Sequence, residues 1–390
     1  MNVAVSTSRL PMAPGTGEAV VDLAAVATNT ELLARAAGSA GLMAVVKADG
    51  FGHGATQVAR TALQHGASWL GVTSPAEALA LRTADIEAPI LMWLYLAGED
   101  LGPVIRAGID ISAGSLADLE ALAVLTERGG PVAKVHLKAD TGLSRGGALP
   151  DDWPQMLAWA RKYEESGRLL VRGVWSHLGN ADDREDPRLV AQLAAFEKAV
   201  RSARAAGLDP QFCHLANSAA TLQIPEARFD LCRPGIALYG IEPIQGCSFG
   251  LQPAMMLHAS VVLTKRVPAG TEVSYGHDWR AERATTLALV PLGYADGVPR
   301  VAGPRASVWI NGVRCRIAGR IAMDQFILDV GDLPVAVGDR AIVFGPGRDG
   351  EPTVADWATW AGTNPHEILT GIGQRVPRRY LPAVPTERFH

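Results

Sequence analysis

The sequence predicts an α/β protein, with an N-terminal (β/α)8 barrel of the TIM type and a C-terminal domain of mostly β structure. Up to about residue 240, short apolar runs alternate with helical stretches at the spacing of βαβ units. At least seven such units favour a closed barrel over an open, doubly wound sheet. After about residue 250, β-branched runs are broken by Gly, Asn-Gly and Asp-Gly, which indicates hairpins. We therefore expect a flexible tail over residues 1–17, the barrel over 18–250 and the β domain over 251–390.

The barrel half begins with the apolar run EAVVDL at 18–23, a strand that is also a candidate to pair with the C-terminal domain. The first helix is expected over 23–38 and closes on Gly38, and another helix opens on Pro75. Further strands are expected at 42–48, 69–73, 88–95, 109–114, 133–140, 171–177 and 212–217. Further helices are expected at 54–67, 75–84, 115–129 and 188–207.

The second half differs from the first in its sequence pattern, because β-branched runs replace the alternation of strands and helices. Its β-branched runs lie at 259–267, 285–292, 305–320, 325–331 and 339–345. Asn311-Gly312 lies inside the third run and is a strong signal for a two-residue hairpin turn. One short helix is expected late in the chain, over 354–362.

Composition and charge narrow the possible classes of function. Hydrophobic residues make up 48% and charged residues 19% of the 390, so the chain can bury large cores. A net charge of −4 provides no basic face for nucleic acid, and the longest apolar run, 89–97, is too short to span a membrane. The four cysteines form no C-x-x-C pair, and the N-terminus carries no secretion signal. We therefore expect a cytoplasmic protein with reduced thiols that binds neither nucleic acid nor membrane.

Reactive side chains gather at the predicted carboxyl ends of the barrel strands, which is where barrel enzymes place their active sites. They are Lys47, Lys138, Asp140, Arg145, His177, Asn217, Ser218 and Arg233. Partial burial lowers the pKa of a lysine, so that its neutral amine can form a Schiff base. A single lysine at a strand end more often extends to solvent, so the interpretation depends on the whole set.

Two neighbouring segments indicate a phosphorylated ligand. RPGIALYG at 233–240 places glycine in a turn whose backbone N–H groups can approach an anion, and HLANSAAT at 214–221 adds the hydroxyl of Ser218. A metal site is not expected, because the nine histidines form neither an H-x-H nor an H-E-x-x-H pattern.

Taken together, the motifs resemble those of the alanine racemase family. AVVKADGFGHGA at 44–55 resembles the pyridoxal phosphate lysine motif of that family, and VHLKADTGLSRGG at 135–147 resembles its second motif. The following motifs then occur in the family's order: HLANSAAT, RPGIALYG, EVSYGHDW, LGYADG, GRIAMDQF and RVPRRY. The resemblance covers residues 18–380. It implies pyridoxal 5'-phosphate as cofactor, a head-to-tail homodimer with shared active sites, and interconversion of L-alanine and D-alanine for cell-wall peptidoglycan.

The resemblance also implies roles for the matched residues. Lys47 and Tyr275 would be the two catalytic bases, one on each face of the substrate, and Tyr275 would come from the partner subunit. The cofactor would be held by Lys47, Arg145, His177, Asn217, Ser218, Arg233, Gly235 and Ile236. The substrate would be bound by Arg145, Met323 and Tyr294, with Met323 also contributed by the partner subunit. Lys138 matches a lysine that is often carbamylated in this family and that orients the arginine at Arg145.

Arg233 carries particular weight in this assignment, because it would face the ring nitrogen of the cofactor with His177 in support. A guanidinium does not readily give up a proton, so the ring nitrogen would stay unprotonated and transamination would be suppressed. Tyr275 would need cationic or hydrogen-bonding neighbours to reach its phenolate form, and His177 and Arg233 are the candidates.

Other functions are less compatible with these residues. A decarboxylase of the same barrel class would need an acid at the ring nitrogen, and a non-catalytic pyridoxal phosphate carrier typically lacks the C-terminal domain. A racemase of the same fold with another or broader substrate, such as serine or lysine, stays open as an alternative.

Three residues depart from the family pattern. Phe51 stands where a tyrosine usually binds the cofactor phosphate, and Gln374 stands where many members have another phosphate-binding tyrosine. Ala322 stands where a cysteine commonly precedes the methionine. One lost hydrogen bond to a charged group costs about 1.5–3 kcal/mol, so we expect weaker cofactor binding with catalysis retained.

Overall fold

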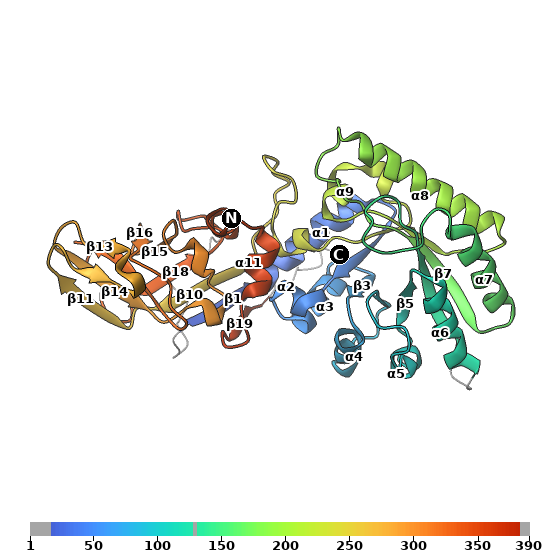
Figure 1. Ribbon diagram of the computed structural model, residues 1–390, viewed down its shortest axis with the longest axis horizontal. Coiled ribbons are helices and arrows are strands. Elements are labelled where there is room, and N and C mark those ends of the chain that lie inside the picture. Colours follow the sequence, from blue (N-terminus) through green and yellow to red (C-terminus); the bar gives the residue numbers. More distant parts are fainter. Residues whose placement is uncertain (1–16, 128–130, 383–390) are drawn as a thin grey trace, which may run out of the picture. The chain divides into compact units, whose positions relative to one another are not determined.

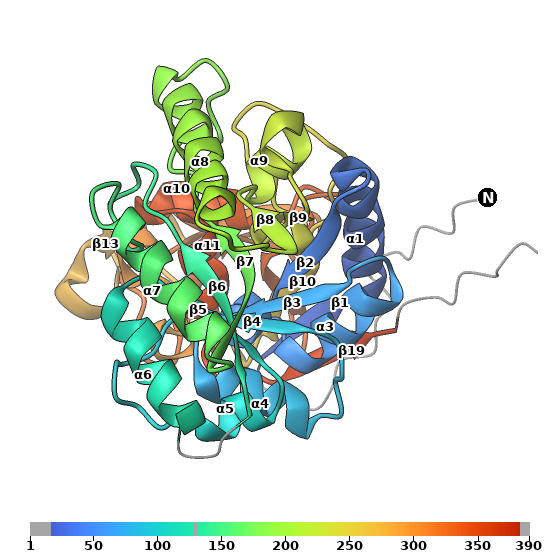
Figure 2. The same cartoon turned by 90° about the vertical axis from the view of Figure 1, so that its right-hand side faces the viewer.

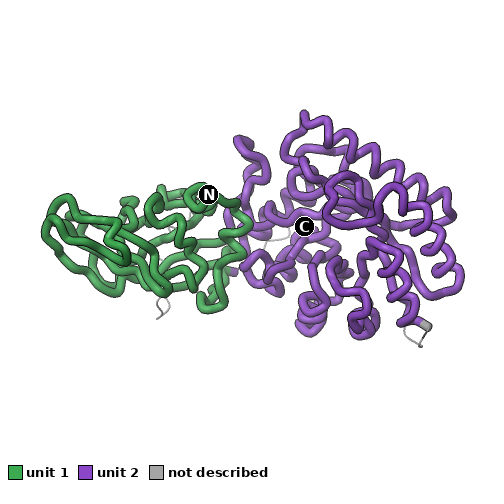
Figure 3. Tube along the Cα trace, viewed as in Figure 1, with its two compact units in different colours: residues 1–22, 254–381 green, residues 23–253, 382–390 purple. Residues whose placement is uncertain are grey.

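The computed structural model describes residues 17–127 and 131–382, which form two compact units (Figures 1 and 3). One unit spans residues 23–253, and the other combines 17–22 with 254–381. Residues 18–22 thus belong to the C-terminal unit and not to the barrel, and 251–253 belong to the barrel unit. Of the tail expected over 1–17, all but Gly17 lies outside the described residues, and Gly17 is the first residue of a strand.

The barrel unit is a ring of eight parallel strands in the order β8-β7-β6-β5-β4-β3-β2-β9, so the predicted fold class is confirmed. Backbone bonds of 2.9 Å from Asp230 N–H to Cys213 O and from Arg233 N–H to Ala216 O join the β9 segment to the β8 segment. These bonds close the ring. Its strands are β2 (Gly41–Val45), β3 (Trp69–Val72), β4 (Ile90–Met92), β5 (Asp110–Ala113), β6 (Ala133–Lys138), β7 (Leu169–Trp175), β8 (Phe212–His214) and β9 (Leu231–Cys232).

Helices surround these strands (Figure 2). They are α1 (Leu23–Ala37), α2 (Lys47–Phe51), α3 (Ala55–Gln64), α4 (Pro75–Thr83), α5 (Gly102–Arg106), α6 (Leu116–Glu127), α7 (Trp153–Glu165), α8 (Pro187–Ala205) and α9 (Ser218–Gln223), with 3₁₀ turns η2 (Pro225–Ala227) and η3 (Ile236–Tyr239). Four of these helices, α2, α5, α7 and α9, were not expected from the sequence. The signal for α7 was present, because its buried residues Trp153, Met156, Leu157 and Ala160 recur at helical spacing.

The C-terminal unit is built on a nine-stranded sheet in the order β11-β14-β17-β16-β15-β18-β10-β1-β19. Its strands are β1 (Gly17–Asp22), β10 (Met255–Ser260), β11 (Leu263–Val267), β14 (Thr285–Val290), β15 (Ser307–Ile310), β16 (Val313–Ile317), β17 (Phe326–Gly331), β18 (Arg340–Phe344) and β19 (Arg378–Leu381). A separate pair consists of β12 (Glu272–Val273) and β13 (Trp279–Arg280), and the helical elements are α10 (Val354–Ala361), α11 (Pro365–Gly371), η4 (Tyr275–His277), η5 (Tyr294–Asp296) and η6 (Arg300–Ala302).

Two features of this sheet follow from local sequence. Strand β1 pairs antiparallel with β10 and parallel with β19, so its buried Val20 packs in one cluster with Met256 and Ile342. The expected hairpin is confirmed: β15 and β16 are joined by Asn311 and Gly312, with φ of 47° and 87°. Both angles lie in the left-handed region that a type I′ turn requires.

Within residues 17–127 and 131–382, no helix combines the length and the apolar character needed to cross a membrane. The same part of the chain holds no group of three or more His, Cys, Asp or Glu side chains placed to bind a metal ion.

Candidate active site

Lys47 lies just past the carboxyl end of β2. The apolar residues 42–46 before it are buried, and Lys47 itself is half-buried. Burial lowers the pKa of Lys47, the positive charge of Arg145 lowers it further, and Glu77 acts in the opposite direction. The amine is therefore neutral more often than an exposed lysine, which is the form that a Schiff base or a general base requires.

The chain after Lys47 turns through the left-handed region of backbone conformation. Ala48, Asp49 and Phe51 each have φ of 52°, and Gly50 has φ of 61°. Such a conformation costs about 1–2 kcal/mol for each residue other than glycine. The surrounding structure must therefore hold the turn in place, and backbone strain of this kind is common at functional sites.

Glu77 is one residue that holds this turn. Its Oε1 accepts from the Ala48 N–H at 2.7 Å, and its Oε2 accepts from the Thr73 N–H at 2.7 Å. Glu77 also completes a capping box with Ser74 at the start of α4. The sequence analysis missed Glu77 as a site-supporting residue, although Ser-Pro-Ala-Glu at 74–77 is a recognisable capping-box pattern.

The residues predicted from strand ends converge into one electropositive cluster. Burial and the charges of Arg145 and Arg233 lower the pKa of Lys138 to about 8, against an opposing effect of Asp140. Burial lowers the pKa of His177 to about 3, and the cations Arg233, Arg145, Lys138 and Lys47 act in the same direction. The neutral amine of Lys138 is therefore accessible near neutral pH. His177 is neutral there, so it can act toward a tyrosine only as a hydrogen-bonding neighbour.

Arg233 is only 5% exposed, and its guanidinium meets neutral acceptors. Nη1 donates to His214 Nδ1 at 3.0 Å, and Nη2 donates to the carbonyls of Ser176 and Leu215 at 2.6 and 3.2 Å. The histidine that contacts Arg233 in the structure is therefore His214. Burial lowers the pKa of Arg233 to about 9, so the group stays charged at neutral pH.

A small cradle of hydroxyl and backbone donors lies at the start of η3. Ser218 Oγ accepts from the Gly235 N–H at 2.9 Å and from the Ala237 N–H at 3.3 Å, which leaves the hydroxyl hydrogen free to donate. Among the described residues, the Ile236 N–H has no hydrogen-bond partner, as is common in the first turn of a helix. This arrangement suits an anionic oxygen.

Asn217 serves the neighbouring helix. Its side-chain oxygen accepts from the Ala220 N–H at 3.1 Å and caps α9, and its backbone carbonyl accepts from the Thr221 hydroxyl. The structure thus places Asn217 next to Ser218 in the chain, as the N-cap of α9.

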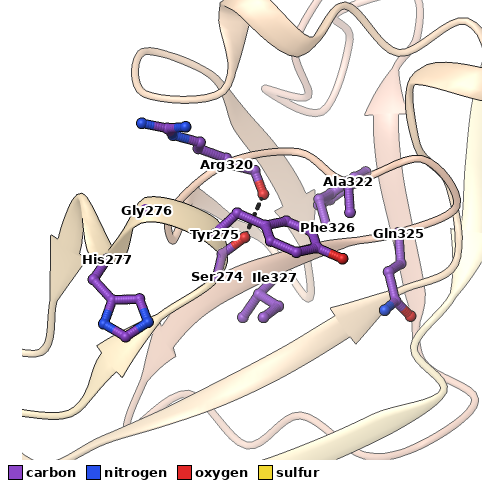
Figure 4. Close-up of a pocket in the computed structure, with 9 residues that line it drawn as sticks. All are labelled: Ser274, Tyr275, Gly276, His277, Arg320, Ala322, Gln325, Phe326 and Ile327. Atoms are coloured by element: carbon purple, nitrogen blue, oxygen red, sulfur yellow. Dashed lines mark hydrogen bonds between the residues drawn. The ribbon is translucent and has the colours of Figure 1, made fainter.

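Three expected site residues lie in the C-terminal unit and are exposed: Tyr275 at 70%, Met323 at 52% and Tyr294 at 43%. Tyr275 lines a pocket of about 390 Å³ together with Ala322 and the other residues labelled in Figure 4. The Ser274 hydroxyl donates to the Arg320 carbonyl at 2.7 Å, drawn as the dashed line in Figure 4, and so anchors the turn that carries Tyr275.

The segments that carry Tyr294 and Met323 are joined directly. The Tyr294 N–H donates to the Ala322 carbonyl at 3.1 Å, and the Ala295 N–H donates to the Met323 carbonyl at 3.0 Å. Arg375 adds an ionic link, because it contacts Asp296 at 3.1 Å and Asp324 at 2.8 Å. The sequence analysis stopped at the neighbouring Gln374, which is exposed, and missed Arg375.

Comparison with known proteins agrees with this geometry. A family model for the alanine racemase N-terminal domain matches residues 21–243, and one for the alanine racemase C-terminal domain matches 254–380. The curated alanine racemase of Salinispora arenicola is 52% identical over 364 residues, which is 93% of this chain and 98% of that protein.

Solved structures give the same result. A crystal structure of alanine racemase from D-cycloserine producing Streptomyces lavendulae has a TM-score of 0.94 and 44% identity, covering 96% of this chain and 99% of that one. Alanine racemase from Bartonella henselae, with covalently bound pyridoxal phosphate, has a TM-score of 0.84 and 30% identity, covering 94% of this chain and 100% of that one. On this identity and coverage, the chain belongs to the alanine racemase family.

Proposed function

We propose that this protein is a pyridoxal phosphate-dependent isomerase that interconverts L-alanine and D-alanine and so supplies D-alanine for cell-wall peptidoglycan. The observation that carries the proposal is Lys47, which is half-buried at the mouth of the barrel and has a lowered pKa. The two domains of the chain both match the alanine racemase family. A racemase of this fold with another or broader substrate, such as serine or lysine, is the alternative.

The residues of the barrel mouth fit the cofactor. Arg233 has five N–H groups and uses three in the bonds described above, so its Nε–H and one Nη1–H have no partner among the described residues. These donors suit an unprotonated ring nitrogen. The Ser218 hydroxyl and the N–H groups of Gly235 and Ile236 suit the phosphate, whose negative charge the cluster of cations would stabilise. When bound, pyridoxal phosphate supplies the electron sink that makes the α-proton of the substrate acidic.

Two side chains are assigned to proton transfer. Lys47 takes up or returns the α-proton at its amine on one face, and its lowered pKa keeps a neutral amine accessible for this role. Tyr275, whose side chain is largely exposed on the C-terminal unit, does the same at its hydroxyl on the other face. A base on each face is the simplest arrangement that both removes and returns a proton with inversion.

Substrate binding and assembly complete the proposal. Arg145 and the Met323 backbone bind the substrate carboxylate, Tyr294 narrows the entrance, and Lys138, once carbamylated, orients Arg145. Two observations support this part. The pKa of about 8 for Lys138 leaves enough neutral amine to react with carbon dioxide, and Tyr275, Tyr294 and Met323 are exposed as a head-to-tail homodimer would require. The free cysteines agree with a reducing, cytoplasmic location.

The test uses the purified full-length protein with added pyridoxal phosphate. Loss of the circular dichroism of L-alanine over time, and of D-alanine in the reverse direction, is the expected result. Lys47→Ala is the control and should abolish both changes. A protein that shows no loss of optical activity with either enantiomer contradicts the proposal, and a faster reaction with serine or lysine than with alanine favours the alternative substrate.

A further inference from the structure

A chain of buried polar side chains runs from Arg233 across the inside of the barrel. Beyond the Arg233–His214 bond, His214 Nε2 lies 2.8 Å from His136 Nδ1, and His136 Nε2 lies 3.0 Å from Asp110 Oδ2. The chain ends where Arg172 Nη1 donates to both oxygens of Asp110, at 3.1 and 3.2 Å. We name these five side chains the barrel relay.

The barrel relay is enclosed except at its end, where Arg172 is partly exposed. Asp110, His136 and His214 are 0% exposed, and a methyl group on Gly173 would lie 2.3 Å from His136 Nδ1. The absent side chain at Gly173 therefore makes room for the His136 ring. Buried polar groups are costly unless they are fully paired, so the four buried members of this chain need a specific physical reason.

The hydrogen-bonding chemistry of the two ends determines which ring nitrogen of each histidine in the relay carries the proton. Arg233 can only donate, so His214 Nδ1 must accept and the proton of His214 must be on Nε2. His214 then donates to His136 Nδ1, and the proton of His136 must likewise be on Nε2. That proton points at Asp110, both of whose carboxyl oxygens also accept from Arg172. Every bond in the chain is satisfied in this one arrangement and in no other.

The charges around the relay agree with this arrangement. Burial lowers the pKa of both His136 and His214, and Arg233 lowers both further, while Asp110 opposes the shift at His136; the net direction is downward for both, so both rings are neutral at neutral pH. If His214 were protonated, its Nδ1 would carry an N–H that faces the Arg233 guanidinium and could not accept a hydrogen bond from it. Asp110 is the one carboxylate of the relay, and it lies between the cation of Arg172 and the neutral rings.

We propose that Asp110 is a positioning residue for Arg233. Asp110 acts through His136 and His214 and keeps His214 Nδ1 as a hydrogen-bond acceptor. This acceptor holds the buried guanidinium of Arg233 in the orientation that presents its free N–H groups to the cofactor. This inference rests on the proposed function. Its consequence is that Arg233 is kept as a fixed donor without a carboxylate beside it that could become a proton donor to the ring nitrogen.

The test is Asp110→Asn in the full-length protein. An asparagine amide can rotate and donate to His136 Nε2, which permits the reversed proton arrangement in which His214 carries its proton on Nδ1 and faces Arg233 N–H to N–H. Side-chain ¹⁵N shifts of histidine distinguish the two tautomers, and His136→Gln and His214→Gln variants assign the signals. Asp230→Asn is the matched control, because Asp230 also accepts a barrel hydrogen bond, from the Cys213 N–H at 2.7 Å, but is not part of the relay.

Three results are expected for Asp110→Asn and not for Asp230→Asn. The His214 signal acquires Nδ1–H character. The kcat for L-alanine falls on the order of 10- to 100-fold, the effect of one weakened hydrogen bond to a charged group, while KM changes less. Pyruvate, which hydrolysis by water would release if the amino group of alanine were left on the cofactor, rises relative to racemisation.

The outcomes separate the inference from the proposed function. If the wild-type protein racemises alanine but Asp110→Asn matches the control in all three measurements, the inference is wrong. If the wild-type protein does not racemise alanine, the proposed function fails, and the ¹⁵N spectrum still decides the relay. If Asp110→Asn does not fold, the wild-type spectrum decides alone: protons on Nε2 of both relay histidines support the inference, and a proton on Nδ1 of His214 overturns it.

Discussion

Replacing Phe51 with tyrosine adds one hydroxyl at a place that the structure defines closely. The Phe51 ring is 5% exposed and packs on Tyr239, with ring centroids 4.7 Å apart. A methyl group on Gly235 would lie 3.1 Å from Phe51 Cζ, the atom that carries the hydroxyl in tyrosine. The new hydroxyl would therefore sit beside the Ser218 and Gly235 cradle. Phe51 has φ of 52°, a cost that tyrosine shares, so the turn itself should not change.

The size of the effect follows from the burial and charge of this position. A hydrogen bond to a charged group contributes about 1.5–3 kcal/mol. A bond from the new hydroxyl to the cofactor phosphate would therefore raise the affinity for pyridoxal phosphate on the order of 10- to 100-fold. Without the cofactor, a buried hydroxyl that finds no partner costs about 1–3 kcal/mol. We therefore expect Phe51→Tyr to bind pyridoxal phosphate more tightly while the cofactor-free protein becomes less stable.

The assay is a titration of cofactor-free protein with pyridoxal phosphate and, as the matched control ligand, with pyridoxal, which lacks the phosphate. Phe51→Tyr should lower the Kd for pyridoxal phosphate and leave the Kd for pyridoxal unchanged. Thermal unfolding of the cofactor-free protein should show the loss of stability. An unchanged ratio of the two Kd values would refute the reasoning, because water or other residues would then already satisfy the phosphate.

Three further substitutions test other parts of the site. Tyr275→Phe should lower kcat/KM for both enantiomers of alanine by about 10²–10⁴-fold, the usual contribution of a general acid or base, with little change in thermal stability; racemisation kinetics near the wild-type rate would remove Tyr275 from the mechanism. His177→Gln should flatten the dependence of stability on pH between about 3 and 6.5. In this window the unfolded chain binds a proton on His177 and the folded protein does not, so the stability of the folded protein falls as pH falls. Unfolding midpoints measured across the window should therefore decline less in the variant than in the wild type. Parallel curves for the two proteins would contradict the lowered pKa of His177. Arg375→Ala removes the ionic link between the segments of Tyr294 and Met323, so KM for alanine should rise severalfold with a smaller change in kcat. A severalfold fall of kcat at unchanged KM would show that Arg375 does not act through substrate binding.

Much of the site could be found from the sequence because its residues are local in the chain or sit at strand ends. Lys47, Lys138 and His177 each occur at or near the end of an apolar run, and parallel strands bring their carboxyl ends to one rim of a barrel. The hairpin at Asn311-Gly312 could be predicted for the same kind of reason, since two adjacent residues specify the turn.

Other features depend on contacts between distant segments, for which one sequence carries no signal. Glu77 supports Ala48 from 29 positions away, and Arg375 contacts Asp296 and Asp324 from a late loop. The state of His177 also depended on its surroundings. Burial and the charges of four side chains from other segments lower the pKa of His177 to about 3, and the sequence alone does not show those neighbours.

The sequence alone thus determined the fold class, the family and the lysine on which the proposed chemistry depends, because periodicity and motif order are properties of the chain itself. Only the tertiary structure decided that Arg233 is held by His214, and that His214 is joined through His136 to Asp110. The physical reason is that a closed barrel brings side chains from β5, β6, β8 and the segment after β9 into one dry interior, where each donor must find an acceptor.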